Sequence, residues 1–177
     1  MRLDLGEGFW VREFCSDDVA GLVRHANNEN VAHNLEDRFP HPYTKEDARD
    51  WLAHVAEQDP PTQFAIATER EVIGGIGLRI RGDVYRRTAE LGYWLGEDHW
   101  GQGVATRAVR TFSAWIFESL PVERIEARVF ETNPASCRVL EKAGFTSEGR
   151  LRHSVLKINM LMDQIVYAIL RHESKSL

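Results

Sequence analysis

Glycines at the start of a predicted helix are the part of this sequence best suited to bind a ligand. Gly101 and Gly103 stand in the segment Trp100–Thr106, which precedes an apolar helical pattern over about residues 103–119. The first N–H groups of a helix have no intrahelical acceptor, and the helix dipole places positive charge there. Glycine lets a ligand approach that backbone closely. The segment therefore predicts a phosphate or pyrophosphate site, with a glycine turn that merely begins a helix as the alternative.

Two other phosphate-binding patterns fit this segment poorly. A Rossmann fingerprint needs a third glycine or an alanine where this sequence has Thr106, and needs its first glycine close behind the strand. A P-loop needs Gly-Lys-Ser/Thr, which the sequence lacks. Short connections between the strands predicted upstream favour an antiparallel meander over a βαβ unit. These observations speak against a dinucleotide-dependent oxidoreductase.

Composition narrows the class of protein further. The chain has 177 residues, 43% hydrophobic and 28% charged, which favours a single globular domain over residues 1–177. A formal net charge of -5 argues against a general nucleic-acid binder. No uninterrupted apolar stretch approaches a membrane span. We expect no signal peptide, because acids and glycines interrupt any apolar run among the first residues. With Cys15 and Cys137 as the two cysteines, we expect a cytoplasmic protein.

Hydrophobic periodicity predicts the elements that would position the glycine segment. The order indicates an α+β protein with a mixed, mostly antiparallel sheet of about seven strands, flanked by about four helices. Residues 29–43 are expected to be irregular. We predict strands at about 9–15, 63–68, 72–81, 88–95, 124–130, 145–156 and 160–170, and helices at about 16–28, after Thr44, at 103–119 and from Asn133-Pro134 to Gly144.

Other reactive residue types lack the spacing that chemistry would need. Cys137 is a poor candidate for a covalent nucleophile, because the sequence places no histidine to activate it. The seven histidines are dispersed, without a His-x-x-x-His pair on one helix face. We therefore expect no metal site.

Several motifs together resemble the GNAT superfamily of acyl-CoA-dependent N-acyltransferases, in the RimJ/RimL branch typified by ribosomal-protein N-terminal acetyltransferases. The resemblance runs from about residue 9 to residue 170. Trp100 departs from the pattern, since the superfamily has Arg or Gln at this position of its motif A. The segments that carry the resemblance are Phe39–Ala48, Tyr93–Leu95, Gly101–Thr106, Asn133-x-x-Ser136 and Glu141–Phe145.

The resemblance implies a fold and a cosubstrate. In the GNAT fold, the strand at 88–95 splays from the strand at 124–130. Acetyl-CoA would be the acetyl donor, with its pantetheine arm against the backbone of Trp94 and Leu95 and a hydrogen bond from Asn133. The pyrophosphate would lie on the backbone amides of Gly101, Gln102, Gly103, Val104, Ala105 and Thr106.

The implied reaction is acetyl transfer to a primary amine, either a protein N-terminal α-amine or a small-molecule amine, by direct attack in a ternary complex. A backbone amide at Leu95 or a neighbour would contact the oxyanion. Glu90 is the expected base, directly or through water, with a solvent-facing strand residue as the alternative. Ser136 is expected to protonate the departing thiolate, unless it is an ordinary early-helix serine.

Acceptor recognition is expected in the loop at 29–43, where His33, Asn34 and Arg38 are candidates by location, and in the turn between the last two predicted strands. The basic cluster Arg79, Arg81, Arg86 and Arg87 would receive the CoA 3′-phosphate or bind nothing. We expect no nucleic-acid or membrane partner, and a homodimer because many relatives form one. The alternative function is a non-catalytic CoA-binding module.

Overall fold

Two units make up the computed structural model of the chain, which describes residues 1–174. Unit 1 comprises Met1–Gly77 and Tyr93–Ala108, and unit 2 comprises Leu78–Gly92 and Val109–Leu177. Three elements run from one unit into the other. They are strands β4 (Val72–Ile80) and β5 (Thr88–Leu95) and helix α4 (Val104–Ser119).

Antiparallel pairings build the sheet of unit 1, in which β1 (Arg2–Gly6), β2 (Phe9–Arg12), β3 (Gln63–Thr68) and β4 are neighbours in sequence order. The register places Val11 of β2 opposite Ile66 of β3, and both side chains are fully buried. Residues 64–67 of β3 are all buried. A continuous apolar run of this kind is typical of a central strand.

Helix α3 (Lys45–Ala56) begins where the sequence predicts. The Thr44 hydroxyl accepts from the Asp47 backbone N–H at 3.2 Å, and the Asp47 carboxylate accepts from the Thr44 backbone N–H at 2.7 Å. This reciprocal pair is a capping box, which satisfies two backbone donors at the helix start. Ala48 on the inner face of α3 is fully buried in an apolar cluster of unit 1.

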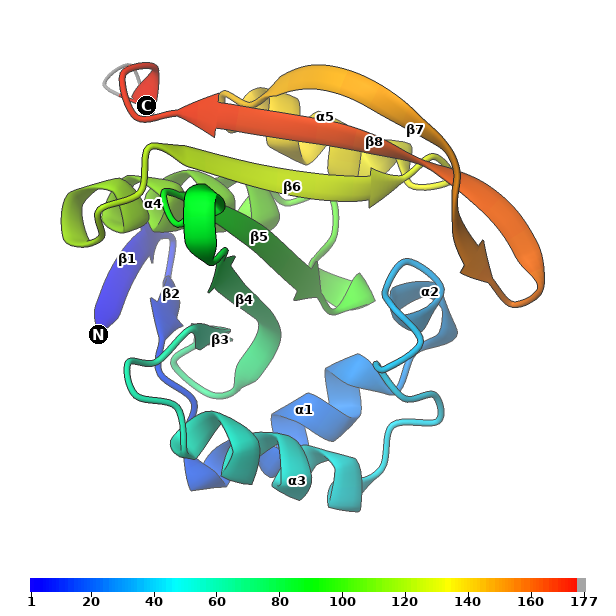
Figure 1. Cartoon of the computed structure of the whole chain (residues 1–177). Helices are drawn as coiled ribbons and strands as arrows, with labels where there is room; N and C mark the ends of the chain where they lie inside the picture. Colours follow the sequence, from blue (N-terminus) through cyan, green and yellow to red (C-terminus); the bar gives the residue numbers. More distant parts are fainter. Residues whose placement is uncertain (175–177) are drawn as a thin grey trace. The chain divides into compact units, whose positions relative to one another are not determined.

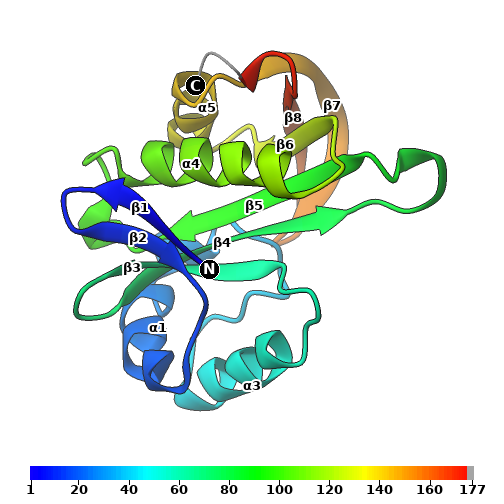
Figure 2. The same ribbon diagram turned by 90° about the vertical axis from the view of Figure 1, so that its left-hand side faces the viewer.

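Helix α1 (Val19–Ala26) lies beside α3 in unit 1 and contributes Leu22 to the same apolar cluster (Figure 2). A further short helix, α2 (Glu29–Ala32), follows α1. Its N-cap is Asn28, whose side chain accepts from the backbone N–H groups of Asn30 and Val31. The expectation of irregular structure throughout residues 29–43 was therefore wrong for this helix.

The sheet of unit 2 contains the splay that the family resemblance implies. β5 runs parallel to β6 (Arg124–Phe130) for three residue pairs, which end at Glu90 and Glu126. Over the described residues no later pair joins these two strands, so they part after Glu90. β8 (Met160–Leu170) pairs antiparallel with β6 and with β7 (Thr146–Lys157), and β7 and β8 form a long hairpin (Figure 1).

The two faces of β6 differ in chemistry. Ile125, Ala127 and Val129 are buried on one face. Figure 1 shows α5 (Pro134–Lys142) behind β6 and β8. Successive residues of a strand point to opposite faces. Arg124, Glu126 and Arg128 therefore point to the other face of the sheet.

The observed sheet confirms the predicted fold class. Its strand order is β1-β2-β3-β4-β5-β6-β8-β7, with mixed and mostly antiparallel pairing. The described residues form eight strands and five helices, where about seven and about four were predicted. The unpredicted strand is β1, whose Leu3 and Leu5 give too short an alternation to identify a strand without its partner β2.

The predicted strand at 9–15 ends at Arg12, and a side chain explains why. Asp18 is buried and accepts from the Arg12 guanidinium at 2.7 and 2.8 Å, and from the Cys15 backbone N–H at 2.9 Å. These bonds turn the chain into a 3-10 turn at Ser16–Asp18 before α1 begins. Across residues 1–174, every helix is too short or too polar to cross a membrane.

Candidate functional site

The predicted phosphate-binding glycines form a turn that leads into α4, within unit 1. Gly101 and Gly103 both have a φ of 75°, a conformation that glycine adopts readily and other residues avoid. A Cβ built on Gly101 would meet nothing within 4 Å, and one on Gly103 would meet Arg107 Nη1 at 3.6 Å. Backbone conformation rather than crowding therefore requires glycine here. The space in front of this backbone is open, as an anion site needs.

The remaining cradle residues connect this turn to the helix. Gln102 is exposed, and its Nε2 donates to the Asp98 carbonyl at 3.0 Å. Val104 is buried, while Ala105 and Thr106 are half-buried. The Arg107 backbone N–H donates to the Gly103 carbonyl at 3.0 Å, which closes the first turn of α4. The backbone N–H groups ahead of Arg107 have no intrahelical acceptor.

Arg107 adds positive charge beside the cradle, and the sequence analysis did not identify it. Its guanidinium forms an ion pair with Glu7 at 2.9 Å and lies 5.7 Å from the ring centre of Phe9. Glu7 lies in the turn between β1 and β2, and Phe9 is the first residue of β2. No spacing in the sequence links these positions to residue 107, so the sequence carried no signal for this contact.

Trp94 and Leu95, the predicted pantetheine contacts, end β5 in unit 1. β4 passes so close that a Cβ on Gly74 would lie 2.4 Å from the Trp94 carbonyl oxygen. Glycine at this position is what permits the approach. The indole Nε1 of Trp100 donates to the Leu95 carbonyl at 2.7 Å, so the atypical residue of the motif connects the end of β5 to the turn before the cradle.

Two histidines lie close together at the turn that follows β5. His25 of α1 is 4% exposed, and a Cβ on Gly96 would come within 2.6 Å of its Nδ1. The rings of His25 and His99 are 5.3 Å apart between centres. Burial, and secondarily the charge of His25, lowers the pKa of His99 below its ordinary value. The sequence analysis treated the histidines as dispersed and missed this pair, because only the packing of α1 brings residues 25 and 99 together.

The loop predicted to recognise the acceptor is anchored to this turn within unit 1. Glu97 accepts from the side-chain amides of Asn28 at 2.7 Å and Asn30 at 3.0 and 3.1 Å. These hydrogen bonds lower the pKa of Glu97. Residues 28–30 therefore lie beside the turn that leads to Gly101.

The three residues predicted to contact the acceptor follow Asn28 and Asn30 in the chain. His33 is the C-cap of α2. The Asn34 side chain donates to the Asn30 carbonyl at 2.8 Å, and Arg38 pairs with Glu36 at 2.7 Å while its side chain is 83% exposed. The amide of Asn34 is thus engaged locally, and Arg38 is the most accessible of the three.

Glu90, the predicted base, lies on β5 within unit 2. Its carboxylate accepts from Arg79 at 2.6 Å and lies 3.8 Å from Arg81 Nη2. The side chain is 21% exposed. Glu90 is therefore an ion-paired, half-buried carboxylate rather than a freely solvated strand residue.

The start of α5 in unit 2 holds two further candidates. Asn133 is the N-cap, and its Oδ1 accepts from the Ser136 backbone N–H at 3.0 Å. Ser136 is half-buried, and the neighbouring Cys137 is buried. The Tyr167 hydroxyl donates to Glu141 at 2.8 Å, and burial raises the pKa of Tyr167. Cys137 lies near Tyr167.

The four arginines of the predicted basic cluster have several different partners. Arg79 and Arg81 pair with Glu90, and Arg81 also pairs with Glu126. Arg87 pairs with Glu123 at 3.3 Å. Arg86 donates to the Asp83 carbonyl of its own turn at 3.2 Å. Arg79 and Arg81 thus share Glu90, while Arg86 and Arg87 have partners of their own, and binding of the 3′-phosphate by these arginines stays a prediction.

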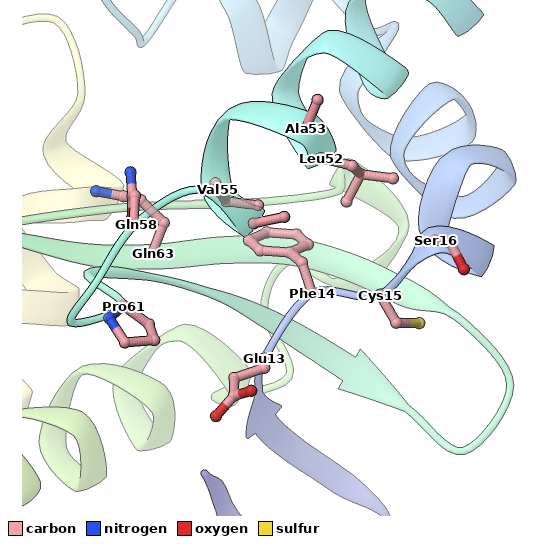
Figure 3. A pocket seen from close by; sticks show the side chains of 11 residues that line it. Glu13, Phe14, Cys15, Ser16, Leu52, Ala53, Val55, Gln58, Pro61 and Gln63 are labelled. Atoms are coloured by element: carbon pink, nitrogen blue, oxygen red, sulfur yellow. The ribbon is translucent and has the colours of Figure 1, made fainter.

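A cavity of about 400 Å³ in unit 1 contains none of the predicted site residues (Figure 3). Phe14, Leu52 and Val55 supply its apolar wall, and Glu13 and Gln58 lie at its edge. Within the described part of the chain, no three His, Cys, Asp or Glu side chains form a group able to hold a metal ion.

Comparison with known proteins gives a consistent result. The sequence matches the family described as Acetyltransferase (GNAT) domain over residues 9–146. It is 40% identical over 123 residues to a probable N-acetyltransferase, YjcK, of Bacillus subtilis, an overlap of 67% of each chain. It is 33% identical over 105 residues to the ribosomal-protein-serine acetyltransferase of Escherichia coli, covering 59% of this chain and 58% of that one.

Solved structures share the fold. One is RimL, a ribosomal L7/L12 alpha-N-protein acetyltransferase in complex with coenzyme A. It superposes with a TM-score of 0.84 at 18% identity, over 96% of this chain and 98% of that one.

Proposed function

Because the chain belongs to the GNAT family of acetyltransferases, we propose that it transfers an acetyl group from acetyl-CoA to a primary amine by direct attack in a ternary complex. Acetyltransferases of this family act on amine acceptors, and the E. coli relative is named for a ribosomal protein. We propose an α-amine of a protein N-terminus or a small-molecule amine as the acceptor.

One observation carries this proposal: the open glycine turn before α4. Gly101 and Gly103 have a positive φ and an unobstructed face, and Arg107 lies beside them. A helix N-terminus with free N–H groups and a nearby guanidinium suits the doubly charged pyrophosphate of CoA. Gly101, Gln102, Gly103, Val104, Ala105 and Thr106 are the residues that we assign to this contact, with Trp94 and Leu95 as the backbone contacts of the pantetheine arm.

The proposed chemistry needs an oxyanion donor near the end of β5. The amine nitrogen forms a bond to the thioester carbon, and the carbonyl oxygen gains charge before the C–S bond breaks. The Gly96 backbone N–H already donates to the Ile73 carbonyl at 2.8 Å. The Leu95 backbone N–H is therefore our candidate for the oxyanion contact.

Proton transfer is assigned to residues of unit 2. We propose Glu90 as the group that accepts the amine proton, directly or through water, and Ser136 as the donor to the departing thiolate. Asn133 uses its Oδ1 to cap α5, which leaves its Nδ2 for the pantetheine arm. Positioning alone contributes a large part of such a rate enhancement.

The organisation of the chain supports a single GNAT domain over residues 1–177, because β4, β5 and α4 each belong to both units. We further propose a cytoplasmic location, which fits the free thiols of Cys15 and Cys137. We also propose that the protein forms a homodimer. His33, Asn34 and Arg38 are proposed acceptor contacts because their loop is anchored to Glu97 through Asn30.

Isothermal titration with acetyl-CoA tests the cosubstrate. Gly103→Glu places a carboxylate in the cradle and should abolish binding that the unchanged protein shows at micromolar concentration. Gly144→Glu is the matched control, because Gly144 is exposed, has a φ of 90° and lies in unit 2. Both variants carry similar backbone strain and the same added charge, so equal melting temperatures would isolate the effect on binding.

An amine panel with radiolabelled acetyl-CoA then tests transfer. Label appearing on an amine supports the transferase. Binding without transfer to any amine would instead favour the non-catalytic CoA-binding module. Absence of binding by the folded, unchanged protein would overturn the proposed use of acetyl-CoA.

A further inference from the structure

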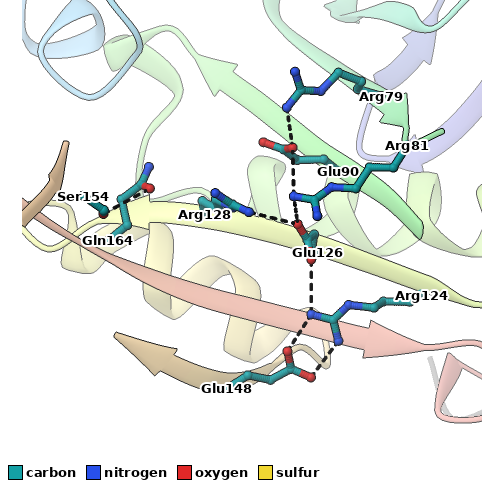
Figure 4. Close-up of polar contacts among 9 residues, drawn as sticks. All are labelled: Arg79, Arg81, Glu90, Arg124, Glu126, Arg128, Glu148, Ser154 and Gln164. Atoms are coloured by element: carbon teal, nitrogen blue, oxygen red, sulfur yellow. Dashed lines mark hydrogen bonds and ion pairs between the residues drawn. The ribbon is translucent and has the colours of Figure 1, made fainter. Parts of the chain in front are cut away.

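One face of the unit 2 sheet carries a network of arginines and glutamates. Arg124, Glu126 and Arg128 alternate along β6, so all three point to the face opposite Ile125, Ala127 and Val129. Glu90 lies on β5 directly beside Glu126 in the register. Figure 4 shows these side chains gathered on the same side of the strands.

Glu126 is the centre of this network. Its side chain is 8% exposed, and three guanidiniums surround its carboxylate. Arg81 lies 2.6 Å from Oε1, Arg124 lies 3.3 Å from Oε2, and Arg128 lies 3.5 Å from Oε1. A buried carboxylate needs such partners, because an unpaired charge there is costly.

Most guanidiniums of the network have a close carboxylate of their own. Arg124 binds both oxygens of Glu148, at 2.7 and 2.6 Å, and this contact lowers the pKa of Glu148. Arg79 lies 2.6 Å from Glu90. Arg81 holds Glu126 at 2.6 Å.

Arg128 differs from these. Among the ion pairs of residues 1–174, Arg128 takes part in the 3.5 Å contact with a Glu126 oxygen that Arg81 already occupies at 2.6 Å. Its side chain is 35% exposed. Arg79, Arg81 and Arg124 each have a carboxylate oxygen at 2.6 Å, so Arg128 is the guanidinium of this network that a close carboxylate neutralises least.

The position of Arg128 relates it to the proposed chemistry. β5 and β6 stop pairing at Glu90 and Glu126, and Arg128 follows two residues later on β6. Two strand residues span about 7 Å, so Arg128 lies a short distance beyond the register position of the proposed base. A molecule that presents an amine near Glu90 can therefore extend a second group toward Arg128.

We propose that Arg128 binds a carboxylate of the acceptor, so that the preferred acceptor is an amine that carries a carboxylate a few bonds away. This inference rests on the proposed acetyltransferase function. A guanidinium with unused N–H donors binds a carboxylate through two parallel hydrogen bonds. The positive charge of Arg128 disfavours a polycationic acceptor.

Matched acceptors test the proposal in the full-length protein at saturating acetyl-CoA. The first pair consists of two peptides that are identical except for their second residue, which is Asp in one and Asn in the other. The second pair consists of a free amino acid and its amide. We expect the KM of each carboxylate form to be lower by about tenfold. The two pairs also distinguish a peptide N-terminus from a free amino acid as the source of the carboxylate.

Variants assign that preference to one side chain. Arg128→Gln should raise the KM for the carboxylate acceptors about tenfold and leave the KM for the amides and the affinity for acetyl-CoA unchanged. Arg128→Lys should recover part of the preference, because it restores charge without the planar fork. Arg70→Gln, in the exposed turn between β3 and β4 of unit 1, is the control for the loss of one positive charge.

Equilibrium binding separates this inference from the transferase proposal. The N-acetylated Asp and Asn peptides cannot react, so their affinities are measured by titration in the presence of CoA. Preference for the Asp form that is lost in Arg128→Gln supports the inference even if no amine is acetylated. Turnover with equal KM values for both forms would overturn it, as would an equal KM increase for both forms in Arg128→Gln.

Discussion

Trp100 connects two parts of the proposed CoA site through one hydrogen bond. Its indole Nε1 donates to the Leu95 carbonyl at 2.7 Å, although the side chain is 43% exposed. The Arg or Gln that the superfamily has here is a flexible side chain, whereas an indole is rigid. Trp100 therefore holds the turn before Gly101 against the end of β5 in this chain.

Replacing Trp100 by Phe keeps an aromatic ring and removes the N–H donor. We expect Trp100→Phe to lower the free energy of unfolding by about 1 kcal/mol, because the Leu95 carbonyl loses its partner. Acetyl-CoA affinity should fall about fivefold if the loosened turn misplaces the cradle. Urea unfolding and titration calorimetry measure the two effects.

The control for this substitution is Trp10→Phe. Trp10 lies under the Arg2 guanidinium at 4.5 Å, a contact that a phenyl ring retains, and it is in β2 rather than in the turn. Equal acetyl-CoA affinities of Trp100→Phe and the unchanged protein would contradict a role of the indole in positioning the cradle.

At the scale of elements, the first turn of α5 combines a structural and a proposed binding role. Asn133 accepts from the Ser136 backbone N–H, and Pro134 occupies the first turn, where its missing N–H costs nothing. The cap orients the helix that carries Ser136. Stability and binding can be separated here, because the cap uses Oδ1 and the proposed pantetheine contact uses Nδ2.

Two substitutions of Asn133 exploit this separation. Asn133→Ala should lower the free energy of unfolding by about 1 kcal/mol, because it removes the cap. Asn133→Asp keeps an acceptor at the helix start and should preserve stability, while it loses the Nδ2 donor. The KM for acetyl-CoA should therefore rise in both variants. An unchanged KM in Asn133→Asp would mean that Asn133 only caps α5.

At the scale of the whole chain, the pair of buried His25 and half-buried His99 predicts how stability depends on pH. The pKa of folded His99 lies below its ordinary value of 6.5, mainly because of burial and secondarily because of His25. Asp98 and Glu71 act in the opposite direction, and Arg24 acts with His25. The unfolded chain then binds a proton at this site more readily than the folded chain, so stability falls as pH decreases below about 6.5.

Thermal unfolding at pH 7.5, 6.5 and 5.5 measures this effect. The melting temperature of the unchanged protein should fall more between pH 7.5 and 5.5 than that of His99→Asn, which cannot take up a proton. His41→Asn, in an exposed loop, should behave like the unchanged protein. Parallel curves for His99→Asn and the unchanged protein would exclude His99 as the source of the dependence.

Much of the fold was predictable because the signals are local. The strands at 63–68, 88–95 and 124–130 match their predicted bounds, since each combines an apolar run with clear turn signals. Thr44 with Asp47, and Asn133 with Pro134, mark helix starts through contacts within one turn. The sequence did not predict β1 or α2, because both elements are short. β1 is stabilised by pairing with β2, and α2 is stabilised by the Asn28 side chain that caps it.

The sequence by itself determined the glycine cradle, since a positive φ at Gly101 and Gly103 and a helix start at Val104 are properties of adjacent residues. The tertiary structure alone decided which distant side chains meet. Contacts of this kind depend on strand order and register, which no local pattern encodes. They include His25 with His99, Arg107 with Glu7, Asn30 with Glu97, and Arg81 with Glu126.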